Sequence, residues 1–306
     1  MGKALADAFA ESRSAFDEVD AALGIPLSRL CFEGPEAGLQ LTANTQPAIL
    51  VASIAAWRTL AARLGWAPGR SPDASRPAFV AGHSLGEYSA LVAAGAIGLA
   101  DAAVAVRRRG QYMQEAVPVG IGAMAAILGL DLPAIEAACR EAAQGQVVSP
   151  ANINSPGQVV IAGHKDAVER ASALARAAGA KRAVTLPVSA PFHCALMAPA
   201  QERLARDLAS VAFHDPEVPL VNNVDALVIR TGDDCREGLV RQVSAPVRWL
   251  ETVQTLAREG VDTVIEVGPG TVLTGLVKKI DKRLRVWNVE DPASLEAALR
   301  ALAEAR

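Results

Sequence analysis

The sequence has few cysteines, and none of them forms the close pair that is typical of a metal site. The four cysteines, Cys31, Cys139, Cys194 and Cys235, are far apart along the chain, and no C-x-x-C motif is present. This spacing argues against a zinc site and against a framework of disulfides. It is typical of a protein from a reducing compartment, and we therefore expect a cytoplasmic protein.

The sequence also lacks an excess of basic residues and a long apolar run. The formal net charge is −3 and the pI is about 5.9, which argues against nucleic acid as a partner. We find no apolar run near the roughly 18 residues that a membrane span requires, so we expect no membrane partner. The first residues, MGKALADAFAESRSAF, contain acidic side chains and resemble neither a secretory signal nor a transit peptide.

Aromatic residues are scarce, whereas alanine is abundant. Aromatic side chains make up 4% of the 306 residues, while 51% of the residues are hydrophobic. Such a composition suits helices that pack closely on a sheet. The length is at the upper edge for one domain, or sufficient for one domain with an inserted subdomain.

The outer parts of the chain alternate between helical and strand patterns. Apolar residues from Leu5 to Leu23 follow helical spacing up to Gly24, and Asn44–Leu64 is apolar nearly all round, which predicts a buried helix. A loop rich in proline, glycine and serine is expected at Gly65–Pro77. Short apolar strands of a parallel sheet covered on both faces are predicted at Ala78–Ala81, Val218–Val224, Thr263–Val267 and Arg285–Val289.

The middle of the chain follows a different pattern. Its elements are expected in the order strand, helix, strand, strand, helix, strand, which is the ferredoxin-like order. The sequence therefore predicts an α/β domain interrupted by a small α+β insert at about residues 120–190. The six segments are Ala123–Leu130, Pro133–Ala143, Val147–Ile153, Val159–Gly163, Lys165–Ala178 and Arg182–Val188.

A G-x-S-x-G motif follows the strand predicted at Ala78–Ala81. It reads Gly82-His83-Ser84-Leu85-Gly86 and leads directly into a helical pattern. This is the arrangement of a nucleophile elbow, in which small flanking residues avoid a collision in a sharp turn. The motif alone also occurs by chance, but its neighbours favour Ser84 as a nucleophile. The backbone N–H of Leu85, at the start of the helix, is then a natural donor to an oxyanion.

A serine nucleophile needs a base, and four histidines are available. His83 adjoins Ser84, but successive side chains of a tight elbow point apart. His164 and His214 are typical of turn and loop residues. His193 follows a strand and lies between Pro191 and a predicted helix start, and we favour it as the base. No Asp or Glu stands out as a third member, and a backbone carbonyl can also orient an imidazole.

Nine stretches together resemble the malonyl-CoA:acyl-carrier-protein transacylases of bacterial type II fatty acid synthesis. They occur in the order of that family and cover nearly the whole chain. The stretches are TQPAIL (45–50), GHSLGEYSAL (82–91), RRRGQYMQEAVP (107–118), GAMAAILGL (122–130), NINSPGQVVIAG (152–163), PFHCALM (191–197), VNNVDA (221–226), LVRQVSAPVRW (239–249) and EVGPGTVLTGL (266–276).

The resemblance implies a fold and a set of site residues. The expected fold is an α/β-hydrolase-like large domain, residues 1–119 and 191–306, with a ferredoxin-like subdomain at residues 120–190. Ser84 matches the family's nucleophile and His193 its general base. Gln242 matches the glutamine whose main-chain carbonyl orients the histidine, which would account for the missing carboxylate. Asn154 matches the insert segment that faces the active site.

The resemblance also implies how the acyl group is selected. Arg109 matches the arginine that pairs with the malonyl carboxylate, and a guanidinium can form two parallel hydrogen bonds to such a group. Arg107 and Arg108 are interpreted as solvated side chains. Leu85 and Phe192 fit malonyl rather than methylmalonyl, because related enzymes that take the branched unit differ at these two positions.

The implied activity is transfer of malonyl from malonyl-CoA to the phosphopantetheine thiol of acyl carrier protein, in ping-pong order through a malonyl-serine. No metal or redox cofactor is needed. The expected partners are malonyl-CoA and the acidic carrier, and the enzyme is expected to be a monomer. Lys181 and Arg182 are candidates for carrier docking, although ordinary surface charge explains them equally well.

One departure from the family concerns the start of the chain. The family begins with a strand and a loop whose glutamine supplies the second oxyanion donor, whereas Met1–Leu5 aligns with the first turn of the next helix. We interpret this as a start assigned too late in the reading frame, the alternative being a genuinely shortened form. We expect residues 1–306 to be slower or less soluble than a version extended upstream.

Three other functions remain open at this point. The same elbow serves esterases and thioesterases, although a carboxylate clamp such as Arg109 has no use in an ordinary esterase. A protein that docks the carrier without becoming acylated is the second alternative. The third is the same chemistry in a polyketide pathway, which one sequence does not separate from fatty acid synthesis.

Overall fold

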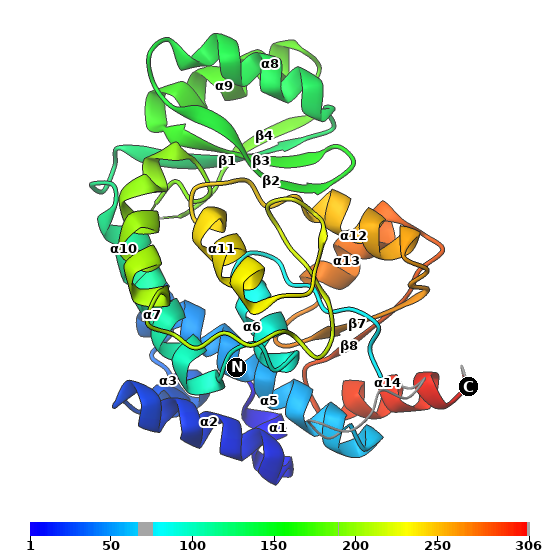
Figure 1. The fold of residues 1–306 in the computed structure, drawn as a ribbon. Helices are drawn as coiled ribbons and strands as arrows, with labels where there is room; N and C mark the ends of the chain where they lie inside the picture. Colours follow the sequence, from blue (N-terminus) through cyan, green and yellow to red (C-terminus); the bar gives the residue numbers. More distant parts are fainter. Residues whose placement is uncertain (67–75, 189, 305–306) are drawn as a thin grey trace.

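The protein consists of two units of different size. The computed structural model describes residues 1–66, 76–188 and 190–304. A small unit formed by residues 122–185 stands on a larger unit built from the chain before and after it (Figure 1). Helices and short strands occur in both units, so the protein has the mixed α/β fold that the sequence predicts.

The small unit contains four strands and two helices in the order expected from the sequence. The strands form one antiparallel sheet in the order β2-β3-β1-β4. The predicted ends hold within a few residues, except that the last strand stops three residues early. The elements are β1 (Gly122–Leu128), α8 (Leu132–Ala143), β2 (Val148–Ser155), β3 (Gln158–His164), α9 (Lys165–Ala177) and β4 (Arg182–Thr185).

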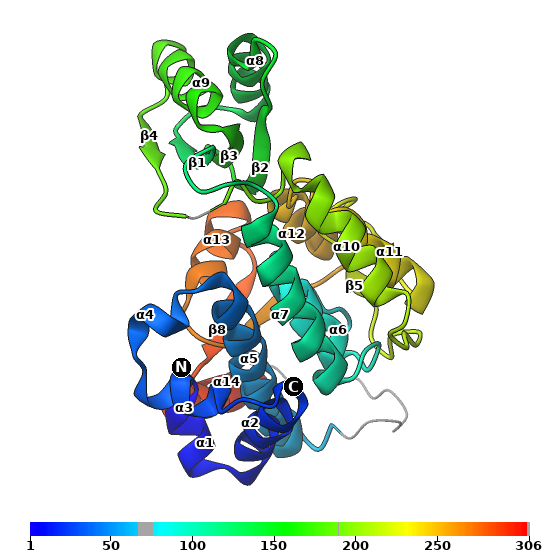
Figure 2. The ribbon, with the colours of Figure 1, turned by 90° about the vertical axis from the view of Figure 1, so that its left-hand side faces the viewer.

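Both faces of this sheet are covered. One face packs against α8 and α9, where Ile127, Ile135 and Ile161 are buried together. The opposite face carries Met124 and Val160, which pack on Phe192 and Cys194 of the larger unit. Figure 2 shows the helices on the outer side of the sheet, away from the larger unit. The sheet therefore presents an apolar face to the loop that contains His193.

The larger unit is mostly helical and, among the described residues, holds two sheets of two strands each. Its elements before the small unit are α1 (Lys3–Ala8), α2 (Ala10–Leu23), α3 (Leu27–Glu33), α4 (Glu36–Leu39), α5 (Thr42–Leu64), α6 (Gly86–Ala93) and α7 (Leu99–Glu115). Those after it are η1 (Ala195–Met197), α10 (Ala198–Leu208), β5 (Leu220–Val221), β6 (Val228–Ile229), α11 (Gly232–Gln242), α12 (Trp249–Arg258), β7 (Thr263–Val267), α13 (Val272–Ile280), β8 (Arg285–Val289) and α14 (Pro292–Glu304).

Helix α5 is the centre of the larger unit. It packs against α2 and α7, and residues such as Leu50, Ile54 and Leu60 are fully buried. Its length and hydropathy alone would allow it to cross a membrane, although the sequence analysis expected no such segment. Because 67% of that apolar window is buried inside the fold, the helix has the character of a core helix.

The predicted parallel strands are present but are partly shorter. β7 and β8 pair in parallel over the predicted residues, from Thr263 opposite Arg285 to Val267 opposite Val289. In the described part of the chain, the segment predicted at Ala78–Ala81 pairs through Val80 alone, which forms a parallel bridge to Leu220. The strand predicted at Val218–Val224 is reduced to β5, because the chain leaves the sheet at Asn222.

Two further expectations concern the N-terminal half of the chain. The first helix is in fact two helices, α1 and α2, because Phe9 takes an extended conformation with φ of −136°. The spacing of apolar residues continues across this break, so the spacing could not reveal it. Most of the loop predicted at Gly65–Pro77, namely residues 67–75, lies outside the described residues.

The two units are joined through β2 as well as through the chain itself. Asn152 forms a parallel bridge with Val247, and the N–H of Ile153 donates to the carbonyl of Val247 at 2.9 Å. The segment after α11 therefore adds a single bridged residue, Val247, to the edge of the small unit's sheet at β2. This bridge fixes the end of β2, and with it Asn154, above the elbow of the larger unit.

Candidate active site

Ser84 lies at a sharp turn between the Val80 bridge and α6. Its φ of 52° is in the left-handed region, which non-glycine residues seldom adopt. A Cβ on Gly82 would lie 2.0 Å from the carbonyl of Gly86, so only glycine fits at that position. A Cβ on Gly86 would meet nothing within 4 Å. The expected need for a small residue thus holds for Gly82 and is wrong for Gly86.

His193 faces Ser84 from a loop of the larger unit. Its Nε2 atom lies 2.7 Å from Ser84 Oγ, and its Nδ1 atom lies 2.8 Å from the main-chain oxygen of Gln242. Because a carbonyl oxygen only accepts, Nδ1 carries the hydrogen and Nε2 is the acceptor for the serine hydroxyl. The φ of His193 is 60°, so both facing residues have left-handed backbones.

The imidazole of His193 is held in its neutral form. It is buried, and burial together with the nearby Arg109 charge lowers the pKa of His193 to about 3. A neutral imidazole with a free Nε2 lone pair can accept a proton at neutral pH. The pair Ser84–His193 can therefore act as nucleophile and general base.

Arg109 places a buried positive charge beside the serine. The side chain comes from α7 and is only 2% exposed. Its Nη2 atom donates to Ser84 Oγ at 3.1 Å and to Gln242 Oε1 at 3.0 Å, while Nη1 donates to Gln46 Oε1 at 2.8 Å. Arg109 Nε is buried without a hydrogen-bond partner among the described residues. Burial lowers the pKa of Arg109 from its ordinary value.

The other two arginines of this run lie outside the site. Arg108 is half exposed and pairs with Asp207 at 3.3 Å. Arg107, interpreted from the sequence as solvated, is partly buried, and its Nη1 atom is buried without a hydrogen-bond partner among the described residues. The side chain of Gln242, from the last residue of α11, is instead part of the site, in addition to its main-chain oxygen.

Three polar residues that the sequence analysis did not single out complete the surroundings of Ser84. Asn223 accepts the N–H of Ser84 at 2.7 Å and donates to the carbonyl of Gly82 at 2.7 Å. Glu87 accepts from the N–H of Asn223 at 2.8 Å and from Gln242 Nε2 at 3.0 Å. Gln46 binds Arg109. All three are buried. The signal in the sequence was their position in three of the stretches that resemble the family, TQPAIL, GHSLGEYSAL and VNNVDA, in which no role was assigned to them.

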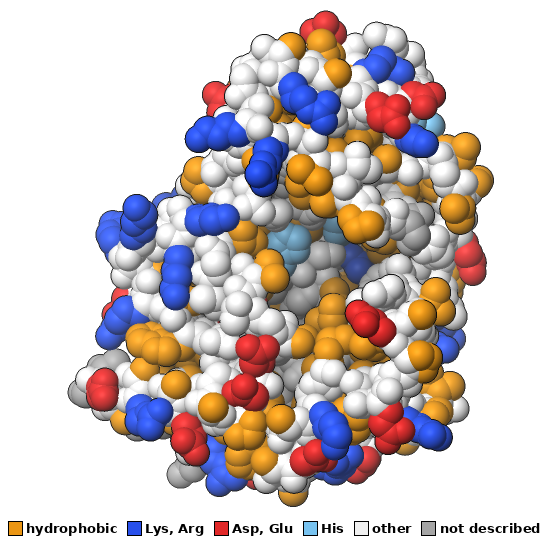
Figure 3. Space-filling model, turned by 180° about the vertical axis from the view of Figure 1, so that it is seen from behind, with side chains coloured by type: hydrophobic (Ala, Val, Ile, Leu, Met, Phe, Trp, Pro, Cys, Tyr) orange, Lys and Arg blue, Asp and Glu red, His pale blue; other side chains and the backbone are white. Residues whose placement is uncertain are grey.

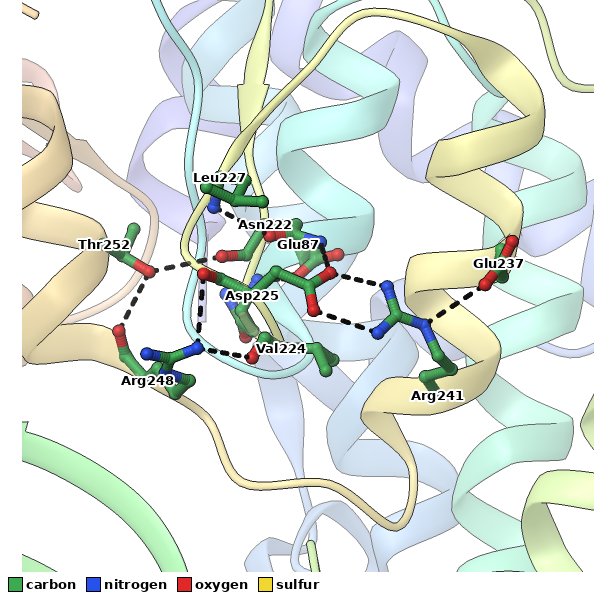
Figure 4. Close-up of polar contacts among 10 residues, drawn as sticks. Glu87, Asn222, Val224, Asp225, Leu227, Glu237, Arg241, Arg248 and Thr252 are labelled. Carbon is green, nitrogen blue, oxygen red and sulfur yellow. Dashed lines mark hydrogen bonds and ion pairs between the residues drawn. The ribbon is translucent and has the colours of Figure 1, made fainter.

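The loop that carries Asn223 is held from two sides. Figure 4 shows Asp225 between α11 and α12: Arg241 donates two hydrogen bonds to its carboxylate, at 3.0 and 2.5 Å. On the other side, Thr252 of α12 donates to the main-chain oxygen of Asn222 at 3.3 Å. The hydrogen bonds from Arg241 keep the pKa of Asp225 below its ordinary value. The loop therefore presents Asn223 to the elbow in a fixed position.

Asn154 and Phe192 lie at the boundary of the two units. Asn154 Oδ1 is 2.8 Å from Nε2 of His83, whose ring lies 5.8 Å from that of Trp249. His83 thus points to the small unit and not to the hydroxyl of Ser84. Phe192 packs partly buried between the two cores. Leu85 is buried, and its backbone caps the start of α6.

The remaining candidates lie on the surface. Lys181 and Arg182 are exposed at the start of β4, the edge strand of the small unit. The structure does not bring them to Ser84. Figure 3 shows a hollow between the two units, with histidine and basic side chains at its surface. Among the described residues, no group of three or more His, Cys, Asp or Glu could hold a metal ion.

Comparison with known proteins agrees with the resemblance that the sequence motifs indicated, over nearly the whole chain. Residues 1–295 match the family model described as acyl transferase domain. The malonyl CoA-acyl carrier protein transacylase of Escherichia coli (strain K12) is 55% identical over 284 residues, which are 93% of this chain and 89% of the relative. That of Bacillus subtilis (strain 168) is 47% identical over 99% of this chain and 93% of the relative.

Solved structures of other proteins also match this chain closely in fold and in sequence. An acyl carrier protein S-malonyltransferase from Vibrio cholerae superposes with a TM-score of 0.92 at 51% identity, covering 97% of this chain and 94% of that one. A type II PKS acyl-carrier protein in complex with its malonyl-transacylase matches with a TM-score of 0.92 at 50% identity, covering 98% and 94%. The chain belongs to the acyl transferase family, as the resemblance in its motifs predicted.

Proposed function

We propose that this protein transfers the malonyl group of malonyl-CoA to the phosphopantetheine thiol of acyl carrier protein, through an ester on Ser84. The observation that carries the proposal is the position of Ser84 Oγ, which lies between the neutral His193 imidazole and the buried Arg109 cation. The relatives' names and the carrier complex described above support this activity.

In the first half-reaction, His193 Nε2 takes the proton of Ser84 as Oγ bonds to the thioester carbon. The resulting oxyanion is stabilised by backbone donors, for which we propose the N–H of Leu85 at the start of α6. The carbon–sulfur bond then breaks, and CoA leaves as a thiol with the proton from His193. The main-chain oxygen of Gln242 holds the imidazole in the required tautomer.

In the second half-reaction, the thiol of the carrier protein replaces CoA. His193 accepts the thiol proton as sulfur bonds to the malonyl carbon, and the ester bond to Ser84 Oγ breaks. Ser84 recovers its proton from His193. The enzyme returns to its starting state, and the residues described need no metal or redox cofactor for these steps.

Arg109 is proposed to select a diacid. Its guanidinium already lies within hydrogen-bond distance of Ser84 Oγ, so a malonyl group on that oxygen would bring its free carboxylate to the same cation. An acetyl group would leave a buried charge unpaired, which costs free energy. Leu85, Phe192 and Asn154 are proposed to bound the acyl site, the first two against a branched malonyl unit.

For the fold, we propose an α/β-hydrolase-like large domain of residues 1–119 and 191–306 with a ferredoxin-like subdomain of residues 120–190. The antiparallel order β2-β3-β1-β4 and the two helices on one face support the second description. The elbow between the Val80 bridge and α6 supports the first.

The carrier is proposed to approach the hollow between the units. Lysine and arginine side chains lie on the small unit on the face that carries the hollow, together with acidic side chains toward its outer edge (Figure 3). The basic side chains would suit an acidic carrier. Lys181 and Arg182 are the candidates named from the sequence. We further propose a monomer in the cytoplasm, where the four free, buried cysteines stay reduced.

A polyketide carrier is the second candidate acceptor. The solved complex at 50% identity contains a type II PKS acyl-carrier protein, so this assignment has specific support. The chemistry at Ser84 is the same in both cases. A panel of phosphopantetheinylated carriers from fatty acid and polyketide systems, compared by kcat/KM, separates the two.

The test of the proposed function compares transfer with hydrolysis. We expect purified protein, malonyl-CoA and a phosphopantetheinylated carrier to give malonyl-carrier as the main product in a mass spectrum. A thioesterase would instead give free malonate and an unchanged carrier. If malonate predominates while carrier is in excess, the transfer function is wrong.

A further inference from the structure

Glu87 is a buried carboxylate that the proposed mechanism does not use. It lies in the first turn of α6, three residues after Ser84, and its side chain is fully buried. Its Oε2 atom accepts hydrogen bonds from the N–H of Asn223 and from Gln242 Nε2, at 2.8 and 3.0 Å. Its Oε1 atom is buried without a hydrogen-bond partner in the described part of the chain. A carboxylate is rarely buried in this way unless its charge is balanced.

The side-chain amide of Gln242 connects Glu87 to Arg109. Gln242 Oε1 accepts from Arg109 Nη2 at 3.0 Å, while its Nε2 donates to Glu87. The amide thus turns its oxygen to the cation and its nitrogen to the carboxylate. A buried cation and a buried anion are separated by a single neutral group, and each reduces the cost of burying the other.

The other ionisable groups near Glu87 do not provide a better counter-charge. Asp225 is negative and is already paired with Arg241. Burial raises the pKa of Tyr88 and raises that of Cys235 to about 12, so both are neutral at pH 7. The groups that act on Glu87, or on which it acts, are Arg109, Asp225, Tyr88, Cys235 and Arg241.

The proposed substrate would disturb this balance. A malonyl group on Ser84 brings a second carboxylate to Arg109, so that one buried cation faces two anions. In a low-dielectric site such an arrangement favours protonation of one of them. The malonyl carboxylate contacts the guanidinium directly and stays charged, whereas Glu87 reaches Arg109 only through Gln242.

We infer that Glu87 is the internal counter-charge of Arg109 in the free enzyme and takes up a proton when a malonyl group docks on Arg109. Glu87 acts on the substrate only through Gln242 and Arg109, and is therefore a positioning residue. The inference rests on the proposed function, because it requires the malonyl carboxylate to reach Arg109.

The direction of the pH dependence follows from the free enzyme. Burial raises the pKa of Glu87 to about 7, against the opposing effects of Asn223, Gln242 and Arg109. Above that pH, Glu87 is ionised in the free enzyme and must gain a proton on binding. Below about pH 6 it is already protonated, and the uptake vanishes. The affinity for malonyl-CoA should therefore fall as pH rises from 6 to 8, by up to about tenfold per unit above the pKa.

Calorimetry of the Ser84→Ala protein with malonyl-CoA tests this, since binding then occurs without acyl transfer. The proton uptake is the slope of the observed enthalpy against the ionisation enthalpy of the buffer. At pH 8 we expect an uptake approaching about one proton per site, and at pH 5.5 almost none. Acetyl-CoA, which has the same phosphates and no free carboxylate, corrects for ionisation of the CoA portion.

Two variants make the assignment specific. Glu87→Gln in the Ser84→Ala background should abolish the uptake and make the affinity for malonyl-CoA independent of pH between 6 and 8. Glu237→Gln, which removes an exposed carboxylate paired with Arg241 (Figure 4), should leave the uptake unchanged. Thermal unfolding curves establish that each variant is folded.

The outcomes separate this inference from the proposed function. Malonyl-CoA that binds without proton uptake at pH 8, or an uptake that persists in Glu87→Gln, would overturn the role of Glu87 while the transfer activity stands. The transfer activity itself is judged on the wild-type protein by formation of malonyl-carrier.

Discussion

At the scale of single residues, the two groups that face each other across the site share a backbone feature. Ser84 and His193 both have φ values near +55°, at 52° and 60°. Such conformations cost about 1–3 kcal/mol each and persist only where the surroundings fix them. Here Asn223 fixes the backbone of Ser84, and Gln242 fixes the ring of His193. These two residues bring Oγ and Nε2 to 2.7 Å from each other.

The role of Arg109 can be tested by removing its charge. Arg109→Gln should lower kcat/KM for malonyl-CoA by about 10²–10³-fold, because the proposed buried pair of the guanidinium and the malonyl carboxylate loses its cation. The ratio of acetyl to malonyl transfer should rise, which steady-state assays with both thioesters measure. Arg108→Gln, one residue away and half exposed, is the control and should change neither value by more than about twofold. Equal losses with both thioesters would contradict a role in selection.

The pH profile reports the state of His193. A base must be neutral, and the lowered pKa of about 3 keeps His193 neutral far below its ordinary range. We therefore expect the acid limb of kcat/KM to lie below pH 5, and any change near pH 7 to come from Glu87 and to disappear in Glu87→Gln. A limb near pH 6.5 that persists in Glu87→Gln would show that His193 titrates normally. Stopped assays between pH 4.5 and 8.5 are sufficient.

The sequence predicts some of these residues and not others for a physical reason. Ser84 is marked by glycines and by its place between a strand and a helix, and His193 by elimination among four histidines. Gln46 binds Arg109 across 63 positions of sequence, and Glu87 binds Asn223 across 136 positions. Stretches that resemble the family contain all three residues, but the partner of each side chain depends on tertiary packing.

At the scale of elements, the elbow depends on one of its two glycines. Gly82→Ala should displace the turn, because its Cβ would lie 2.0 Å from the backbone of Gly86. We expect a loss of stability of about 1–3 kcal/mol and a loss of acyl transfer of at least about tenfold. Gly86→Ala is the matched control, since its Cβ would meet nothing within 4 Å. This variant should keep both the stability and the acyl transfer of the wild-type protein. Chemical unfolding and transfer assays measure the two effects. Equal behaviour of the two variants would refute this account of the motif.

Some ends of helices and strands follow from the apolar pattern of the sequence, and others do not. β7 and β8 match their predicted ranges, because each is a short apolar run between helices. The apolar spacing does not reveal the break at Phe9, because helical spacing continues from α1 into α2. The strand predicted at Val218–Val224 ends at Val221, because Asn222 and Asn223 leave the sheet to bind Asp225 and Ser84. Local apolar patterns contain no information on such polar contacts.

At the scale of the whole molecule, the site lies where two units meet. The small unit contributes Asn154 next to His83, while the larger unit contributes Ser84, His193 and Arg109. The bridge between Asn152 and Val247 ties the units together a few residues from α11, which ends in Gln242. The order of elements in the insert could be predicted from the sequence, whereas the packing of its sheet on the loop of His193 could not.

The buried charge of Glu87 should also affect global stability. Its pKa is raised to about 7 in the folded protein above its ordinary value of 4.5, so the folded state binds a proton more tightly than the unfolded state. Stability should therefore fall as pH rises from about 4.5 to 7. Glu87→Gln should raise Tm relative to wild type at pH 8, by about 2–4 °C for each kcal/mol relieved, and have little effect at pH 4.5. Scanning calorimetry of both proteins at pH 8 and at pH 4.5 tests this prediction. A difference in Tm between variant and wild type that is the same at both pH values would contradict it.

The measurement that tests the central claim most directly is the intact mass of the protein after brief mixing with malonyl-CoA. We predict a gain equal to one malonyl group in the wild-type protein, no gain in Ser84→Ala, and removal of the gain when carrier bearing free phosphopantetheine is added. A malonyl adduct that forms on Ser84→Ala, or one that the carrier does not remove, would contradict the account.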